Sequence, residues 1–162
     1  MSGLGAIRDE RLLTFEVAGA AYALPIGDVL EVSEVARIDR VPGLRGDLGG
    51  VMQYHGDALP VLARAALFPV GAGELPEPQH VVVVAGDGGD VPRLGLPVDR
   101  VLGLADAVLP AARPRDELSV RVPLDGRVTG VLDAELLVRR AAEVVARAEE
   151  NLVPNPEHGG ET

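Results

Sequence analysis

Residues 24–32 read LPIGDVLEV, and residues 96–104 read LPVDRVLGL, so one pattern occurs twice with a shift of 72 residues, from 24 to 96. A second pair of blocks follows with a shift of 70, because Gly56, Val61-Leu62 and Leu67-Phe68 recur as Gly126, Val131-Leu132 and Leu137-Val138. Two blocks in the same order at nearly one shift predict an internal duplication. We therefore expect two similar β subdomains that share one core, each too small to be stable alone.

Short β-branched runs separated by turn residues predict a mainly β chain. The runs that we expect to form strands are 12–18, 21–24, 59–62, 81–85, 93–98, 120–124 and 128–132. Glycine and proline interrupt them at positions typical of hairpin turns: 18–20, 41–43, 86–90 and 124–126. This pattern is typical of a β-barrel or a β-sandwich.

One segment near the end has helical spacing instead. From Asp133 onward, apolar residues recur every three or four positions, and Asp133 is a suitable N-cap, so we expect a helix to about Asn151. Shorter helical turns are expected at 64–68 and just after Pro25 and Pro42. Residues 1–10 and 152–162 lack any periodicity and are expected to be loose tails, which leaves 11–151 as one domain.

Composition and charge exclude several classes of protein. The chain has 15 Lys+Arg against 25 Asp+Glu, a formal net charge of -10, which disfavours nucleic-acid binding. It has no cysteine and no lysine, so thiol chemistry, thiolate metal sites, Schiff bases and a Walker phosphate loop are excluded. Aromatic residues make up only 2% of the chain, so Val, Leu, Ile and Ala must build the core. Neither a membrane span nor a signal peptide is visible, and we expect a cytoplasmic protein that folds without a cofactor or metal.

With the duplication in place, residues 12–140 resemble the CheW-like family of chemotaxis coupling proteins. The motifs that carry the resemblance are, in order, YALPI (22–26), RVPG (40–43), LPV (59–61), GLPVDRV (95–101) and GVLD (130–133). The resemblance implies two five-stranded, SH3-like β-barrels packed side by side around a shared core, with a C-terminal helix and a hydrophobic groove between the barrels.

The resemblance also implies a function without catalysis. Members of this family are adaptors that link the cytoplasmic tip of a methyl-accepting chemoreceptor to the regulatory domain of a CheA histidine kinase. They are recruited to membrane receptor arrays through these partners and do not enter the membrane themselves. On this reading the partner-binding residues are, in this sequence, Val29, Glu31, Val32, His55, Gly56, Val98, Asp99 and Val101. For the valines a purely core role is the alternative, and for Asp99 the alternative is to anchor a turn.

Three positions depart from the family pattern. The family's Asn-x-Arg-Gly turn is QYHG at 53–56, so His55 replaces an arginine; Arg45 stands where a proline is common; and Ala63 stands where an acidic residue is usual. Arginine is always charged, whereas histidine is ordinarily uncharged at neutral pH, so contacts with partners are expected to differ.

Two other functions compete with the adaptor reading. A divergent CheW-like protein could bind only one of the two partners, or serve motility or another sensory pathway. A small hydrolase or a ligand-binding barrel is the alternative from another class. The sequence offers it little, because His55 has no serine, cysteine or threonine beside it and the three histidines are isolated.

Overall fold

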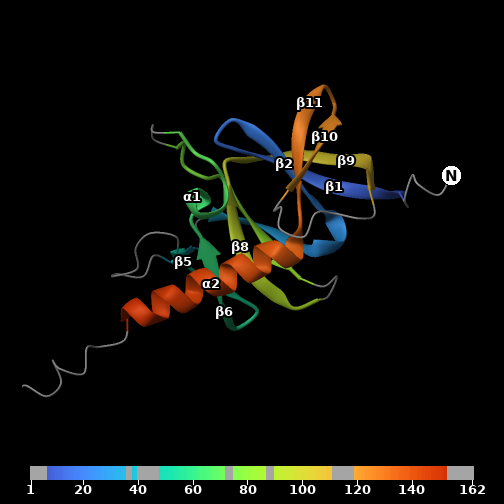
Figure 1. Ribbon diagram of the computed structural model, residues 1–162. Helices are drawn as coiled ribbons and strands as arrows, with labels where there is room; N and C mark the ends of the chain where they lie inside the picture. Colours follow the sequence, from blue (N-terminus) through green and yellow to red (C-terminus); the bar gives the residue numbers. More distant parts are fainter. Residues whose placement is uncertain are drawn as a thin grey trace, which may run out of the picture.

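Two β-sheets and one long helix make up the chain in the computed structural model, which describes residues 7–35, 38–39, 48–71, 75–86, 90–110 and 119–152 (Figure 1). Sheet A contains β1 (Ile7–Val17), β2 (Ala20–Pro25), β9 (Arg100–Pro110), β10 (Ser119–Leu124) and β11 (Arg127–Leu132). Sheet B contains β3 (Val29–Glu34), β4 (Ile38–Asp39), β5 (Leu48–Tyr54), β6 (Asp57–Leu62), β7 (His80–Ala85) and β8 (Pro92–Val98). The helices are the 3-10 turn η2 (Ile26–Asp28), α1 (Arg64–Leu67) and α2 (Ala134–Leu152).

The two sheets have the same strand arrangement. Sheet A runs β10-β11-β2-β1-β9, and sheet B, read in the matching direction, runs β5-β6-β8-β7-β3 with β4 added beyond β5. Each sheet therefore takes two strands from one half of the chain and the remaining strands from the other half. The mainly β, two-subdomain fold predicted from the sequence is confirmed. Each subdomain, however, combines strands from both sequence repeats.

The register of the strands reproduces the duplication in detail. Val131 pairs with Ala23 across the parallel contact of sheet A, and Val61 pairs with Gly95 at the corresponding place in sheet B. The bulges also correspond, because Leu102 is skipped where β9 pairs with β1, and Leu30 is skipped where β3 pairs with β7. Shifts of 70 and 72 residues relate these positions, so the repeat that the sequence predicts is confirmed.

Two-residue turns close three of the hairpins. Ala18-Gly19, His55-Gly56 and Asp125-Gly126 all have positive φ at both residues. Such turns match the right-handed twist of the flanking strands, and glycine takes the second position without a steric cost. The turns expected at 18–20 and 124–126 are confirmed. Those at 41–43 and 86–90 include residues outside the described part of the chain.

The core has three parts. A shared core lies between the sheets and contains residues of both, together with residues from both α-helices: Leu13, Phe15, Leu24, Leu67, Val82, Leu94, Leu96 and Leu137 are among its members. A smaller hydrophobic cluster lies on the opposite face of each sheet. It is centred on Met52, Val61 and Val81 in sheet B and on Leu12, Ala23 and Val131 in sheet A. Without the other sheet, each sheet would expose the apolar side chains of its shared-core face to water.

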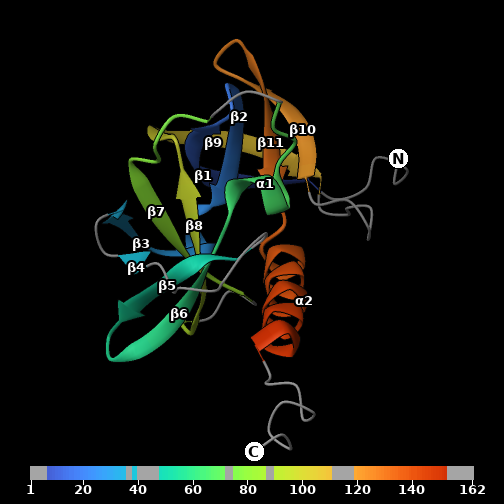
Figure 2. The same ribbon diagram turned by 90° about the vertical axis from the view of Figure 1, so that its left-hand side faces the viewer.

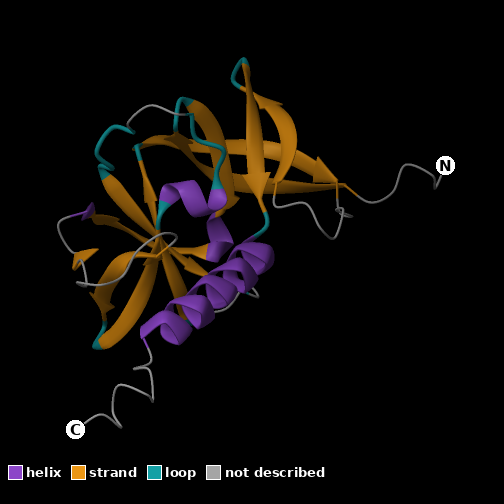
Figure 3. Cartoon of the chain, turned by 60° about the vertical axis from the view of Figure 1, so that its left-hand side comes forward, coloured by secondary structure: helices purple, strands orange, loops and turns teal. Residues whose placement is uncertain are grey.

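Helix α2 begins and packs as the sequence predicts. The Asp133 carboxylate accepts hydrogen bonds from the backbone N–H groups of Glu135 and Leu136, at 2.9 and 3.2 Å, so Asp133 is the N-cap. Ala134, Leu137, Ala141 and Val144 form the buried face of the helix. Figures 2 and 3 show the helix running beside the strands of sheet B, with α1 close to its beginning.

The structure changes three expectations. β1 begins at Ile7, so residues 7–10 belong to a strand rather than to a loose tail, since they pair with β9. Sheet B has a sixth short strand, β4, which pairs with β5. The strands β3, β5 and β9 were not expected as strands, whereas the helical turns at 64–68 and after Pro25 are present as α1 and η2. The helical turn expected after Pro42 lies outside the described residues.

Candidate partner-binding surface

Val98 and Asp99 stand at the end of β8, and both are buried. Val98 is fully enclosed in the shared core, so it cannot line a groove as the sequence analysis expected. Val29 and Val101 are partly buried against the same core. The core role that was the alternative for the valines therefore holds for Val98.

Asp99 joins three parts of the fold. Its carboxylate accepts a hydrogen bond from the Ala18 backbone N–H at 2.8 Å and forms an ion pair with the Arg64 guanidinium. Its own backbone N–H donates to the Glu16 carbonyl at 2.9 Å. The anchoring role that was the alternative for Asp99 is therefore present, and its buried carboxylate has internal partners in place of an external one.

Glu31 and Val32 lie side by side in β3, at the end of sheet B. Val32 is 39% exposed. Glu31 is half-buried and accepts a hydrogen bond from the Ser33 hydroxyl at 2.8 Å. Of the expected residues, these two and the partly buried Val29 belong to one strand.

His55 and Gly56 form the turn between β5 and β6, and both are exposed. The His55 ring packs edge-on against Tyr54, with ring centroids 4.3 Å apart. In the strand order of sheet B, β7 and β8 separate this hairpin from β3. The expected residues therefore divide into two surface groups, one on β3 and one at the hairpin tip.

Strand β9 carries apolar residues that the sequence analysis missed. Leu102, Leu104 and Val108 are exposed, and they alternate with less exposed neighbours along the strand. The 72-residue shift places Leu104 at the position equivalent to Val32, so the repeat itself was the signal that could have found this strand. We use the name edge-strand face for Val32 on β3, the end strand of sheet B, together with Leu102, Leu104 and Val108 on β9, the end strand of sheet A.

The edge-strand face can bind but carries no reactive group. Its four side chains are aliphatic, with the exposed Asp106 between Leu104 and Val108 in the same alternating row of β9. Burying aliphatic side chains against a partner is favourable in proportion to the area removed from water. Among the described residues, no group of three or more His, Asp or Glu side chains could hold a metal ion. In the same part of the chain, no helix is long and apolar enough to cross a membrane.

Two interleaved β-sheets, a C-terminal helix and exposed aliphatic side chains on the end strands make up this β domain. The model of the CheW-like domain family matches residues 11–142, and the chain belongs to that family. This membership assigns it to the chemotaxis scaffolding and adaptor proteins, which form an adaptor family and not an enzyme family.

A solved structure agrees with the fold. The chain is similar to the crystal structure of the scaffolding protein TtCheW from Thermoanaerobacter tengcongensis, with a TM-score of 0.61 and 20% sequence identity. The similarity covers 78% of this chain and 90% of that one. A comparison with curated protein sequences finds no match.

Proposed function

We propose that this chain couples chemoreceptors to a CheA-type histidine kinase, by binding the cytoplasmic tip of a receptor and the regulatory domain of the kinase. The observation that carries the proposal is the edge-strand face, which offers aliphatic side chains from both sheets on a domain of the CheW-like family. Recruitment to membrane receptor arrays would follow from receptor binding.

The receptor is assigned to the edge-strand face on chemical grounds. A receptor tip is a helical hairpin, and helices bind proteins mainly by placing an apolar side in an apolar surface. Leu104 and Val32 are equivalent by the repeat, so the face offers similar anchors on both sheets.

The receptor assignment is tested by adding a charge to the face. Leu104→Asp and Val32→Asp should each weaken binding of a receptor-tip fragment at least tenfold, because a charge buried in an apolar contact lacks a partner. Both positions are exposed, so the unfolding midpoint should change little. Val91→Asp is the matched control, since Val91 is equally apolar and 55% exposed but lies outside the face. Wild-type affinity for both face variants would overturn the assignment.

The kinase is assigned to the His55-Gly56 hairpin tip, where the family carries arginine. His55→Arg restores a permanent positive charge on an exposed turn, and it should tighten binding to an acidic kinase regulatory domain several-fold at pH 7.5. Weaker kinase binding by His55→Arg would mean that a divergent kinase recognises histidine rather than arginine at this position. No change would remove His55 from the interface. A chain that binds only the receptor or only the kinase in these titrations would be the divergent single-partner protein.

A further inference from the structure

A cleft of about 850 Å³ lies on sheet A, on the side that faces α1. Its floor comes from β2, β10 and β11, and its wall from Leu67 and Phe68 at the end of α1. Val128 on its rim is 66% exposed, the highest value among the exposed large apolar side chains of the described residues. None of the residues that form this cleft belongs to the edge-strand face.

The equivalent place on sheet B holds a helix. By the repeat, β2, β10 and β11 correspond to β8, β5 and β6, and α2 packs on all three of those strands. Leu94 and Leu62 of that surface share a core with Leu137, Ala141 and Val144 of α2. The repeat counterpart of α2 is α1, which has only four residues against nineteen in α2.

Helix α1 stops early for a local reason. Phe68 has extended backbone angles, φ -121 and ψ 146, and Pro69 follows it, which disfavours a helical conformation at Phe68. The Phe68 ring then packs on Tyr22 with centroids 4.5 Å apart. Among the described residues, sheet A therefore has only the short α1 at the place where sheet B has the long α2 (Figure 2).

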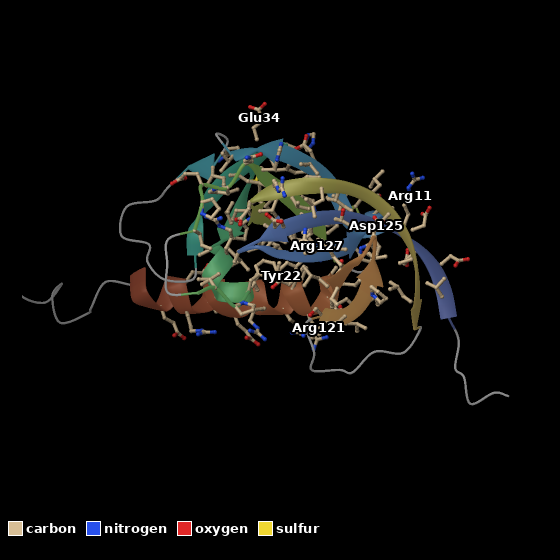
Figure 4. The ribbon with its side chains drawn as sticks, turned by 90° about the horizontal axis from the view of Figure 1, so that it is seen from above. Arg11, Tyr22, Glu34, Arg121, Asp125 and Arg127 are labelled. Carbon is tan, nitrogen blue, oxygen red and sulfur yellow. The ribbon has the colours of Figure 1, made fainter. Side chains whose placement is uncertain are left out.

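One row across the cleft floor differs from its counterpart. Arg121, Gly130 and Tyr22 are neighbours across β10, β11 and β2, whereas the equivalent row beneath α2 is the apolar set Val51, Pro60 and Leu94. A Cβ atom at Gly130 would lie 3.1 Å from Cδ1 of Tyr22 and 3.3 Å from Oγ of Ser119, so these two side chains pack closely over the glycine. Burial raises the pKa of the Tyr22 phenol, and the positive charge of Arg121 lowers it. Figure 4 labels both side chains.

We infer that this cleft is a second docking site, and that its occupant is an amphipathic helix of a partner protein with a carboxylate that meets Arg121. The helical form is inferred from the equivalent seat of α2. The acidic residue on the partner helix is inferred from Arg121, which is the positively charged residue among Arg121, Gly130 and Tyr22. The site is separate from the edge-strand face and goes beyond the proposed receptor and kinase contacts.

Two synthetic peptides test the inference on the full chain. Both are 18-residue amphipathic helices with leucine at positions i, i+3, i+4 and i+7; one carries glutamate beside the leucine side and the other carries lysine there. The glutamate peptide should bind saturably and at least tenfold more tightly than the lysine peptide. The NMR shifts that it causes should be confined to β2, β10, β11 and residues 67–69.

Three variants separate this cleft from the rest of the surface. Arg121→Glu should reverse the preference between the peptides, and Val128→Asp should weaken the glutamate peptide at least tenfold; both side chains are exposed, so folding should persist. Val108→Asp, at an exposed valine of the edge-strand face, should change binding less than twofold.

Three results would overturn the inference. They are the absence of saturable binding by either peptide, equal loss in Val108→Asp and Val128→Asp, and dimerisation of the chain that Val128→Asp abolishes. The last result would identify a second copy as the occupant. None of the three bears on receptor binding at Leu104 and Val32, so the proposed function is tested independently.

Discussion

Asp99 is the residue at which β8, the turn between β1 and β2, and α1 meet. Its buried carboxylate is satisfied by the Arg64 guanidinium and the Ala18 N–H. A buried ion pair contributes little net stability when compared with well-packed apolar residues, but removing one partner leaves a charge without compensation. The pair thus connects the end of β8 with α1 and with the turn between β1 and β2.

The first residue-scale prediction concerns this pair. Arg64→Ala should lower the free energy of unfolding by about 3 kcal/mol, because it leaves the Asp99 carboxylate buried and half-satisfied. Arg100→Ala is the control, since Arg100 is adjacent in sequence but forms a 3.4 Å ion pair with Glu16 from a 57% exposed side chain. That substitution should cost less than about 1 kcal/mol. Equal losses by chemical denaturation would show that the Asp99 pair is no different from a surface pair.

Tyr22 gives a prediction about pH. Burial, the larger effect, raises its pKa above 10.0, and Arg121 lowers it. Because the folded-state pKa is the higher one, the corresponding stability is present below pH 10 and is lost as pH rises through the folded value. In a Tyr54→Phe background, the 295 nm absorbance should report a single tyrosine titrating above 10, and Arg121→Gln should raise its midpoint further. A midpoint at or below 10 would contradict the partly buried position of the ring.

At the scale of elements, the repeat supplies a matched pair of helix caps. Asp133 caps α2, whereas the equivalent residue before α1, Ala63, makes no side-chain cap although its backbone is extended as a cap requires. Asp133→Ala should lower the free energy of unfolding by about 1 kcal/mol, and Ala63→Asp should raise it by about 0.5 kcal/mol. Opposite signs in denaturant titrations are the expected result. Destabilisation by Ala63→Asp would show that α1 cannot accept the cap.

The strands differ in how far their own residues predict them. The run VVVV at 81–84 is recognisable as a buried strand, and it is one. β9 contains Gly103, Ala105, Asp106 and Ala107, which have low strand propensity, so its extended form depends on pairing with β1. β5 contains Gly49 and Gly50 and is supported in the same way by β6. Missing β9 removed Leu102 and Leu104 from the predicted site.

Some residues of the candidate site could be placed on the surface from the sequence, and others could not. The exposed positions of Val32 and His55 agree with a surface role, because one lies on an end strand and the other on a hairpin turn. Val98 could not be separated from Val32 by residue type, since only the packing of two sheets buries one valine and exposes the other. The interleaving of the repeats could not be predicted either, because two similar motifs do not specify whether a strand pairs within its own half or with the other half.

At the scale of the whole molecule, the interleaved sheets predict that neither half folds alone. The fragment 1–72 lacks three strands of sheet A, and the fragment 73–162 lacks the strands that complete sheet B. Each should give a poorly dispersed NMR spectrum by itself, and the two mixed should recover the dispersion of the full chain. A dispersed spectrum from either fragment alone would show that a repeat is a folding unit.

A coupling protein must hold the receptor and the kinase at the same time. Sedimentation velocity of a labelled CheA-type kinase mixed with a receptor-tip fragment tests it most directly, with and without the chain. With wild-type chain, one boundary should contain all three components, and Leu104→Asp should remove the receptor from that boundary while the kinase remains. If the kinase and the receptor fragment instead displace each other from the chain, it does not bridge them, and the coupling function is wrong.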